Sequence, residues 1–217
     1  MAEESVVVAV PPFTAADILA RRNRLIGLDE PVLAAPSRAG DHQLNPNSPP
    51  SAAAPRDAAV LVAVVDHEPG ASVVLTRRTD HLAAHAGQIA FPGGKIDRTD
   101  HDPAAAALRE AEEEIGLDPR LVRLIGYGDP YLTTSGYRIV PVVGVVAASP
   151  TLVANPHEVA DVFEVPLSFL MTPANHHTGS REWQGMQRQF YVMPYADRQI
   201  WGITAGIIRT LFERIYG

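Results

Sequence analysis

The chain has 217 residues, of which 46% are hydrophobic and 20% are charged, with a formal net charge of −7 at pH 7 and no cysteine. This composition is ordinary for a globular chain long enough to bury one substantial core. The lack of cysteine excludes disulfides, thiolate nucleophiles and cysteine-based zinc sites. The net negative charge argues against nucleic-acid binding through a broad basic face.

Neither a membrane span nor an export signal is expected. The longest apolar stretch, residues 139–148, is interrupted by Pro141 and Gly144 and is shorter than the roughly 20 residues that a spanning helix needs. Acidic Glu3 and Glu4 precede a short apolar run, unlike the basic start of a secretory signal. We therefore expect a cytoplasmic protein without a membrane partner.

The first quarter of the chain predicts one helix and a long loop. Residues 14–28 have partial helical periodicity behind Thr14 as a possible cap. Residues 34–56 are rich in proline, serine, asparagine and alanine, which favours a linker with little regular structure. We expect residues 1–57 to form this N-terminal part and residues 58–217 to form the main domain.

The main domain is predicted to alternate strands with a few helices. Residues 58–65 and 72–77 are separated by Glu68-Pro69-Gly70, which indicates an antiparallel hairpin. Further strands are expected at residues 89–91, 123–128, 138–147 and 160–165, a short helix at 166–170, and a late hairpin from residues 181–184 and 189–192. This order is typical of an α/β fold with helices on both sides of a mixed sheet.

A last helix is predicted at the end of the chain. Thr204 is the expected cap, and an apolar stripe follows at helical spacing, comprising Ile203, Ile207, Ile208, Leu211, Phe212 and Ile215. Such a stripe is typical of a structural core helix. The aromatic residues Tyr195 and Trp201 precede it, and we interpret them as core residues in preference to partners of an adenine ring.

One further helix carries a cluster of charged residues. Asp102 is placed to cap it, Pro103 suits its first turn, and Gly116 suits its left-handed end. Its apolar face comprises Ala107, Leu108, Ala111 and Ile115. Its charged residues are Arg109, Glu110, Glu113 and Glu114.

The spacing of these acids predicts a metal site. Side chains three and four residues apart share a helix face, so we expect Glu110, Glu113 and Glu114 to converge. The turn Pro92-Gly93-Gly94 precedes the helix and lets backbone approach a ligand closely. An oxygen-only shell favours Mg²⁺ or Mn²⁺ over zinc. The alternative is a solvated acidic face.

These residues resemble the signature box of the Nudix hydrolases. The resemblance is carried by Gly94, Asp100 and the run Arg109-Glu110-Ala111-Glu112-Glu113-Glu114-Ile115-Gly116-Leu117. Aspartate at position 100 in place of glutamate, and one extra residue before Arg109, are similar to the coenzyme A pyrophosphatase branch of that family.

A second block upstream also resembles that branch. It comprises Val74-Leu75-Thr76-Arg77-Arg78-Thr79, His85, Gly87-Gln88 and Phe91-Pro92-Gly93-Gly94, and it departs from the branch at Ala83, where a basic residue is usual. Downstream, similar segments are Thr134-Ser135-Gly136-Tyr137, Asn155-Pro156-His157-Glu158-Val159 and Ile200-Trp201-Gly202-Ile203-Thr204-Ala205. The resemblance covers roughly residues 58–215.

The resemblance implies an α/β/α sandwich around a mixed sheet and assigns roles to individual residues. The implied metal ligands are Glu110, Glu113, Glu114 and the Gly94 carbonyl, with Arg109 orienting the carboxylates. The implied substrate-binding residues are Arg77, Arg78, His85 and Gln88. For the general base we favour Glu158 over Asp100 and Glu164.

The implied activity is metal-dependent hydrolysis of the diphosphate of coenzyme A or an acyl-CoA. The products would be adenosine 3′,5′-bisphosphate and a 4′-phosphopantetheine. Two alternatives stay open: a Nudix enzyme acting on another nucleoside diphosphate compound such as ADP-ribose or a dinucleotide, and a non-catalytic domain that binds a nucleotide. The sequence also leaves the oligomeric state open.

Overall fold

The computed structural model describes residues 12–34, 36–47, 53–79, 87–147, 149–183 and 185–217. A nine-stranded sheet is built from β1 Ala39–Gly40, β2 Arg56–Val65, β3 Ser72–Arg78, β4 Ile89–Ala90, β5 Gly93–Lys95, β6 Val122–Tyr127, β7 Tyr131–Leu132, β8 Tyr137–Val146 and β9 Val159–Pro166. A three-stranded sheet is built from β10 His177–Trp183, β11 Met186–Tyr195 and β12 Arg198–Trp201. The helices are α1 Ala15–Ala20, α2 Pro103–Ile115, α3 Leu167–Leu170 and α4 Ile203–Ile215, with short 3₁₀ turns at η1 Arg22–Arg24, η2 Asp41–Gln43, η3 Pro119–Leu121 and η4 Pro173–Asn175.

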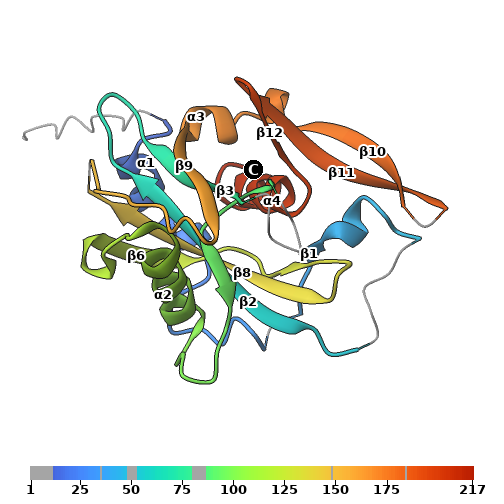
Figure 1. Ribbon diagram of the computed structural model, residues 1–217, viewed down its shortest axis with the longest axis horizontal. Coiled ribbons are helices and arrows are strands. Elements are labelled where there is room, and N and C mark those ends of the chain that lie inside the picture. The colour runs from blue at the N-terminus through green and yellow to red at the C-terminus, as the bar shows by residue number, and fades with distance from the viewer. Residues whose placement is uncertain (1–11, 35, 48–52, 80–86, 148, 184) are drawn as a thin grey trace, which may run out of the picture.

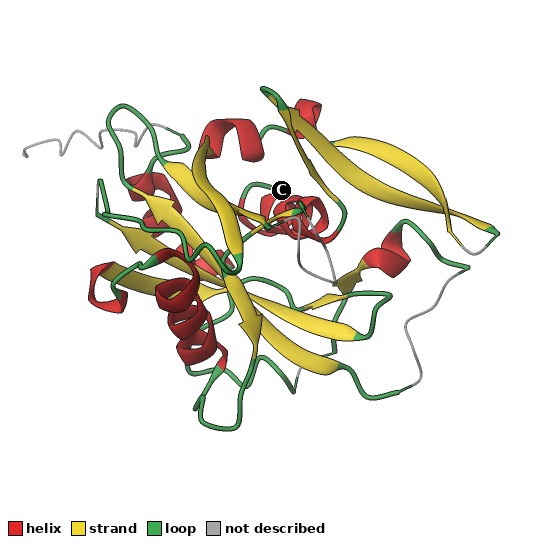
Figure 2. Cartoon of the chain, in the orientation of Figure 1, coloured by secondary structure: helices red, strands yellow, loops and turns green. Residues whose placement is uncertain are grey.

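Alternation along β2 explains the layers seen in Figures 1 and 2. Successive strand residues point to opposite faces, so Leu61 and Ala63 join the buried cluster that contains α2. Val62 and Val64 join the cluster that contains α4. The two helices therefore lie on opposite faces of a mixed sheet, and the predicted α/β/α sandwich is confirmed.

The centre of the sheet is a long parallel pair. Strand β2 pairs with β8 from Arg56↔Tyr137 to Val65↔Val146. The predicted hairpin of β2 and β3 is antiparallel as expected, but it pairs only Val64 with Val73 and Val65 with Ser72. Most of β3 pairs with β9 instead, because the backbone groups of β2 are taken by β8 and by β5.

The predicted helix at residues 14–28 is wrong in length. Thr14 caps it as predicted, since its side chain accepts from the Asp17 N–H, but α1 ends at Ala20. Leu25 is then buried, and Ile26 forms an antiparallel bridge with Tyr127. Burial of Leu25 and pairing with the sheet outweigh the helical pattern of the segment.

Residues 39–43 have regular structure, although the sequence predicted a loop there. Ala39 and Gly40 form β1, which pairs in parallel with β7, and η2 follows. The Asp41 carboxylate accepts from the Tyr131 hydroxyl at 3.0 Å and from the Thr134 N–H at 2.8 Å. These tertiary hydrogen bonds give regular structure to a sequence whose composition favours a loop. The rest of the segment includes residues 35 and 48–52, which lie outside the described ranges.

The C-terminal elements agree with the prediction except at the start of the last helix. The late hairpin exists as β10 and β11 and is longer than predicted. Helix α4 begins after Gly202, which has φ of 66°, and not with Thr204 as cap. The Thr204 hydroxyl instead donates to the Ile89 carbonyl at 2.8 Å. No helix among the described residues is long and apolar enough to cross a membrane.

Candidate active site

Helix α2 has the ends that its sequence predicts. Asp102 accepts from the Ala105 N–H, Pro103 occupies the first turn, and Gly116 ends the helix in the left-handed conformation. Ala107, Ala111 and Ile115 are fully buried against the sheet, and Leu108 is partly buried beside them. The buried face fixes the rotation of the helix, so its charged residues have defined directions.

Glu114 is an acid inside the protein. It is only 3% exposed. Its carboxylate accepts from the Gly93 N–H at 3.1 Å and lies 3.7 Å from a terminal nitrogen of Arg78. Burial raises the pKa of Glu114 to about 7; these two contacts oppose the shift, and the negative charges of Glu110 and Glu158 add to it. The folded chain therefore holds a carboxyl group whose charge is poorly compensated.

The glycine turn reaches this region because its residues lack side chains. On Gly93, which has φ of +154°, a β-carbon would collide with the backbone of Ala59 and Val60 in strand β2. A β-carbon on Gly94 would clash with the Glu110 carboxylate. The chain thus packs two peptide groups between β2 and α2 and leaves the Glu110 carboxylate against the backbone.

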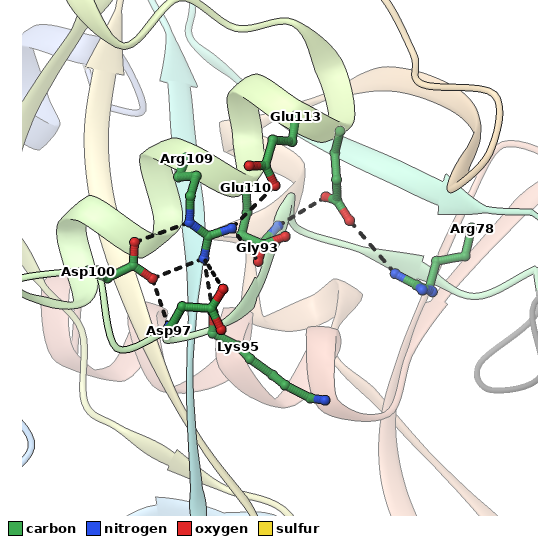
Figure 3. Close-up of polar contacts among 9 residues, drawn as sticks. Arg78, Gly93, Lys95, Asp97, Asp100, Arg109, Glu110 and Glu113 are labelled. Atoms are coloured by element: carbon green, nitrogen blue, oxygen red, sulfur yellow. Dashed lines mark hydrogen bonds and ion pairs between the residues drawn. The ribbon is translucent and has the colours of Figure 1, made fainter.

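Arg109 connects the site to its surroundings, as Figure 3 shows. It donates to both oxygens of Asp100, at 3.1 and 2.9 Å, and to the Lys95 carbonyl at 3.2 Å. It also donates to Glu110 at 2.9 Å and to Glu113 at 3.2 Å. A forked guanidinium suits such a set of acceptors. Arg109 therefore ties the loop after β5 to helix α2.

The acids around Arg109 respond to it differently. The hydrogen bonds from Arg109 hold the pKa of Asp100 below its usual value. Burial raises the pKa of Glu110, although Arg109 opposes the shift. Asp100 therefore serves as an anchor for Arg109. Sequence reasoning considered it as a general base and missed the anchoring role, for which the only signal was its position close before an arginine-bearing helix.

The third predicted ligand, Glu113, contacts Arg109 in the structure. The Glu113 side chain is 57% exposed and is held by Arg109 one helical turn back. In Figure 3 it points toward Arg109. Within the described ranges, no three histidine, aspartate or glutamate side chains gather closely enough to hold a metal ion. Glu110 is close enough to Glu114 for its negative charge to raise the pKa of Glu114.

The two remaining candidate bases lie at opposite ends of β9. Glu158 directly precedes the strand; its carbonyl accepts from the Thr79 N–H at 3.0 Å, and its charge raises the pKa of both Glu110 and Glu114. Glu164 instead contacts His67 at 2.7 Å and the Ser72 hydroxyl. Six residues of strand separate the two acids by roughly 20 Å, so Glu164 does not belong to the site.

The upstream block meets the acidic helix in space. Arg78 lies beside Glu114, and its backbone N–H donates to the Gln88 carbonyl at 3.0 Å. Arg77 is on the same strand, where its backbone is in register with Ile89 of β4 and Asp161 of β9. His85, predicted to bind substrate, and Ala83 lie outside the described residues. Tyr195 and Trp201 pack against Phe169 and Phe190 respectively.

Two solved structures are similar to this chain. RenU, a Nudix hydrolase from M. smegmatis, is 25% identical, covers 51% of this chain and 70% of its own, and has a TM-score of 0.45. The Nudix domain of Shewanella oneidensis NrtR, which was crystallised with ADP ribose, is 21% identical, covers 59% and 82% of the two chains, and has a TM-score of 0.42.

Sequence comparison gives a closer likeness. The uncharacterized Nudix hydrolase NudL of Yersinia pestis (strain Pestoides F) is 41% identical over 160 residues, which cover 74% of this chain and 80% of the relative. NudL of Yersinia pseudotuberculosis serotype O:1b (strain IP 31758) gives the same values. The family model of the Nudix domain matches residues 55–184. With its glycine turn and buried glutamate inside that match, this chain belongs to the Nudix hydrolase family.

Proposed function

We propose that this Nudix hydrolase cleaves the diphosphate of coenzyme A or an acyl-CoA. Water attacks phosphorus, one P–O bond of the diphosphate breaks, and the products are adenosine 3′,5′-bisphosphate and (acyl-)4′-phosphopantetheine. The observation that carries the proposal is the contact between Arg78 and Glu114, 3.7 Å apart. This contact joins the two sequence blocks that resemble the coenzyme A pyrophosphatases, one supplying a cation and the other a buried acid.

The donor set suits Mg²⁺ or Mn²⁺. Glu114 is buried and Glu110 is partly buried, and both have raised pKa values, so a nearby cation would relieve their unfavourable charge. The missing side chain of Gly94 leaves room for the Glu110 carboxylate against the backbone. We assign Glu110, Glu113, Glu114 and the Gly94 carbonyl as the groups that would hold the ion. When bound, the cation neutralises phosphate charge and lowers the pKa of a water molecule.

The protein's own groups have separate tasks in this scheme. Arg109 holds Glu110 in place through its hydrogen bond, and Asp100 and the Lys95 carbonyl hold Arg109. Arg78 donates to a phosphate oxygen, and Arg77, His85 and Gln88 complete the substrate contacts. Glu158 takes the proton of the attacking water, because it is the third acid close enough to affect both Glu110 and Glu114.

The test is chromatography of the products formed from coenzyme A, ADP-ribose and diadenosine polyphosphates with Mg²⁺. Wild type and Glu158→Gln are compared. Adenosine 3′,5′-bisphosphate from coenzyme A, formed by wild type and strongly reduced in the variant, is the expected result. Turnover of another compound alone would reject coenzyme A as the substrate, and binding without turnover would reject an enzyme.

A further inference from the structure

We propose that Arg56 and Arg188, together with the loop at residues 133–136, form a second anion site that binds a phosphate monoester. These two arginines come from β2 and β11, which belong to different sheets. Both guanidinium groups contact the same loop. The identity of the ligand, the 3′-phosphate of coenzyme A, rests on the proposed function, whereas the site itself rests on the contacts below.

Arg188 is held against this loop without an acidic partner among the described residues. Its terminal nitrogen donates to the Thr134 hydroxyl at 3.0 Å. Its Nε is buried without a hydrogen-bond partner, as are those of Arg78 and Arg214, but these two lie 3.7 and 2.7 Å from a carboxylate. The charge of Arg188 is therefore the one left for a bound anion.

The position of Arg188 is fixed by its neighbour in the strand. The Asn45 side chain exchanges two hydrogen bonds with the backbone of Gln189, at 2.8 and 2.9 Å. The Thr134 hydroxyl that receives Arg188 is itself within 3.2 Å of Asp41. These hydrogen bonds pin the hairpin of β10 and β11 next to the loop.

Arg56 approaches the loop from the sheet. Its guanidinium lies over the Tyr137 ring, 4.0 Å from the centroid, and its Nη2 lies 3.4 Å from the Ser135 carbonyl. The neighbouring acid, Asp57, pairs with Arg138 instead. Within the described ranges, no carboxylate pairs with Arg56. Two arginines and one acid, Asp41, therefore contact this loop, and they leave it with a net positive charge in a chain of net charge −7.

A cavity of about 350 Å³ lies beside Arg56 at this loop. Its lining contains no acid among the described residues; it comprises Ala53, Ala54, Arg56, Thr134, Ser135 and Gly136. The Thr134 N–H and hydroxyl already donate to Asp41, so the donors left for a phosphate are the forked guanidinium groups. The chemistry therefore favours a dianionic phosphate monoester over a neutral or cationic ligand.

The strand that carries Arg56 also pairs with the glycine turn. Ala59 pairs with Gly94, and the backbone of Arg56 lies three residues before Ala59 on β2, or about 10 Å along the strand. A ribose with phosphates on its 3′ and 5′ positions has a similar length. We therefore assign the second site to the 3′-phosphate of a nucleotide whose diphosphate lies near the glycine turn.

Calorimetry with adenosine 3′,5′-bisphosphate and adenosine 5′-monophosphate tests the site without turnover. We expect wild type to prefer the bisphosphate at least about tenfold. Arg188→Gln and Arg56→Gln should each reduce that preference, Arg188→Lys should restore part of it, and the exposed Arg123→Gln should leave it unchanged. Loss of the preference in Arg123→Gln, or its survival in both Arg188→Gln and Arg56→Gln, would overturn the proposal.

Kinetics separate this proposal from the proposed function. With coenzyme A and 3′-dephospho-coenzyme A, Arg188→Gln should lower kcat/KM about tenfold for the first substrate alone. Equal loss for both substrates would reject the 3′-phosphate assignment. If neither is hydrolysed but the preference for the bisphosphate depends on Arg188, the coenzyme A reaction fails and the site stands. If coenzyme A is hydrolysed and both variants behave like wild type, the site fails and the reaction stands.

Discussion

Asp17 and Glu114 are two acids buried to the same extent, at 4% and 3% exposure, in opposite electrostatic surroundings. Burial disfavours ionisation of Asp17, but hydrogen bonds from Arg21, Tyr216 and the Phe13 N–H outweigh it, so the pKa of Asp17 is lowered. Glu114 has one N–H donor and a distant arginine, and its pKa rises to about 7.

The donors around Asp17 satisfy its charge within the protein, and they join α1 to the end of α4. The charge of Glu114 is instead opposed by those of Glu110 and Glu158. Groups with strongly perturbed pKa values and poor compensation are typical of functional sites, which supports the functional role that we propose for Glu114.

The largest expected effect is on activity at Glu114. Glu114→Gln should lower kcat by at least about 10²–10³-fold, the scale seen when one preorganised electrostatic group is removed. Steady-state kinetics with Mg²⁺ measures it. Glu112→Gln, at the exposed neighbouring position on α2, is the matched control and should retain activity. If the kcat of Glu114→Gln were within a factor of ten of the wild-type value, the proposed functional role of Glu114 would be rejected.

Asp17 should matter for stability instead. Asp17→Asn should reduce the free energy of unfolding at pH 7 by about 2 kcal/mol, since it weakens hydrogen bonds to a charged group. A lowered folded pKa means that this contribution exists above the unfolded value of 3.8 and is lost as pH falls through the folded pKa. Urea unfolding at pH 7 and pH 3 should show the difference shrink; an equal difference at both would contradict it.

The opposite sign is expected for Glu114 in the metal-free protein. Its pKa rises from 4.5 to about 7 on folding, so stability falls as pH increases through that window and stays lower above it. Glu114→Gln should therefore stabilise the protein at pH 8 by roughly 1–3 kcal/mol. Thermal or urea unfolding with a chelator measures this. If the variant were less stable than wild type at pH 8, the carboxyl would be well compensated after all.

Arg109 should give the smallest of these effects. Arg109→Lys keeps the charge but loses the fork that holds both oxygens of Asp100. We expect about a tenfold decrease in kcat with little change in KM, because Glu110 loses its orientation while substrate contacts persist. The matched change Arg123→Lys should have no effect. A selective rise in KM would instead assign Arg109 to substrate binding.

Local signals in the sequence predicted local structure well. The limits of α2 follow from Asp102, Pro103 and Gly116, because caps act within one turn. The prediction of a long helix at residues 14–28 was wrong because Leu25 packs into the core and Ile26 pairs with Tyr127, about 100 residues away in the sequence.

The same distinction applies within the candidate site. Helical spacing places Glu110, Glu113 and Glu114 near one another, and it also allows the i,i+4 contact of Arg109 with Glu113. It cannot reveal that Glu164 pairs with His67, or that Arg78 lies beside Glu114. These outcomes depend on strands that meet only in the folded sheet.

The hydrogen bond from Tyr216 to Asp17, 2.8 Å long, joins residues 199 positions apart, and this has a consequence for synthesis on the ribosome. Asp17 leaves the ribosome long before Tyr216, so this hydrogen bond forms only after nearly all the strands have been made. Until then its carboxylate has the local Arg21 side chain and Phe13 N–H as donors, without the tie to the end of α4. A nascent chain that stalls before Tyr216 should therefore hold α1 less firmly and expose it more to proteases.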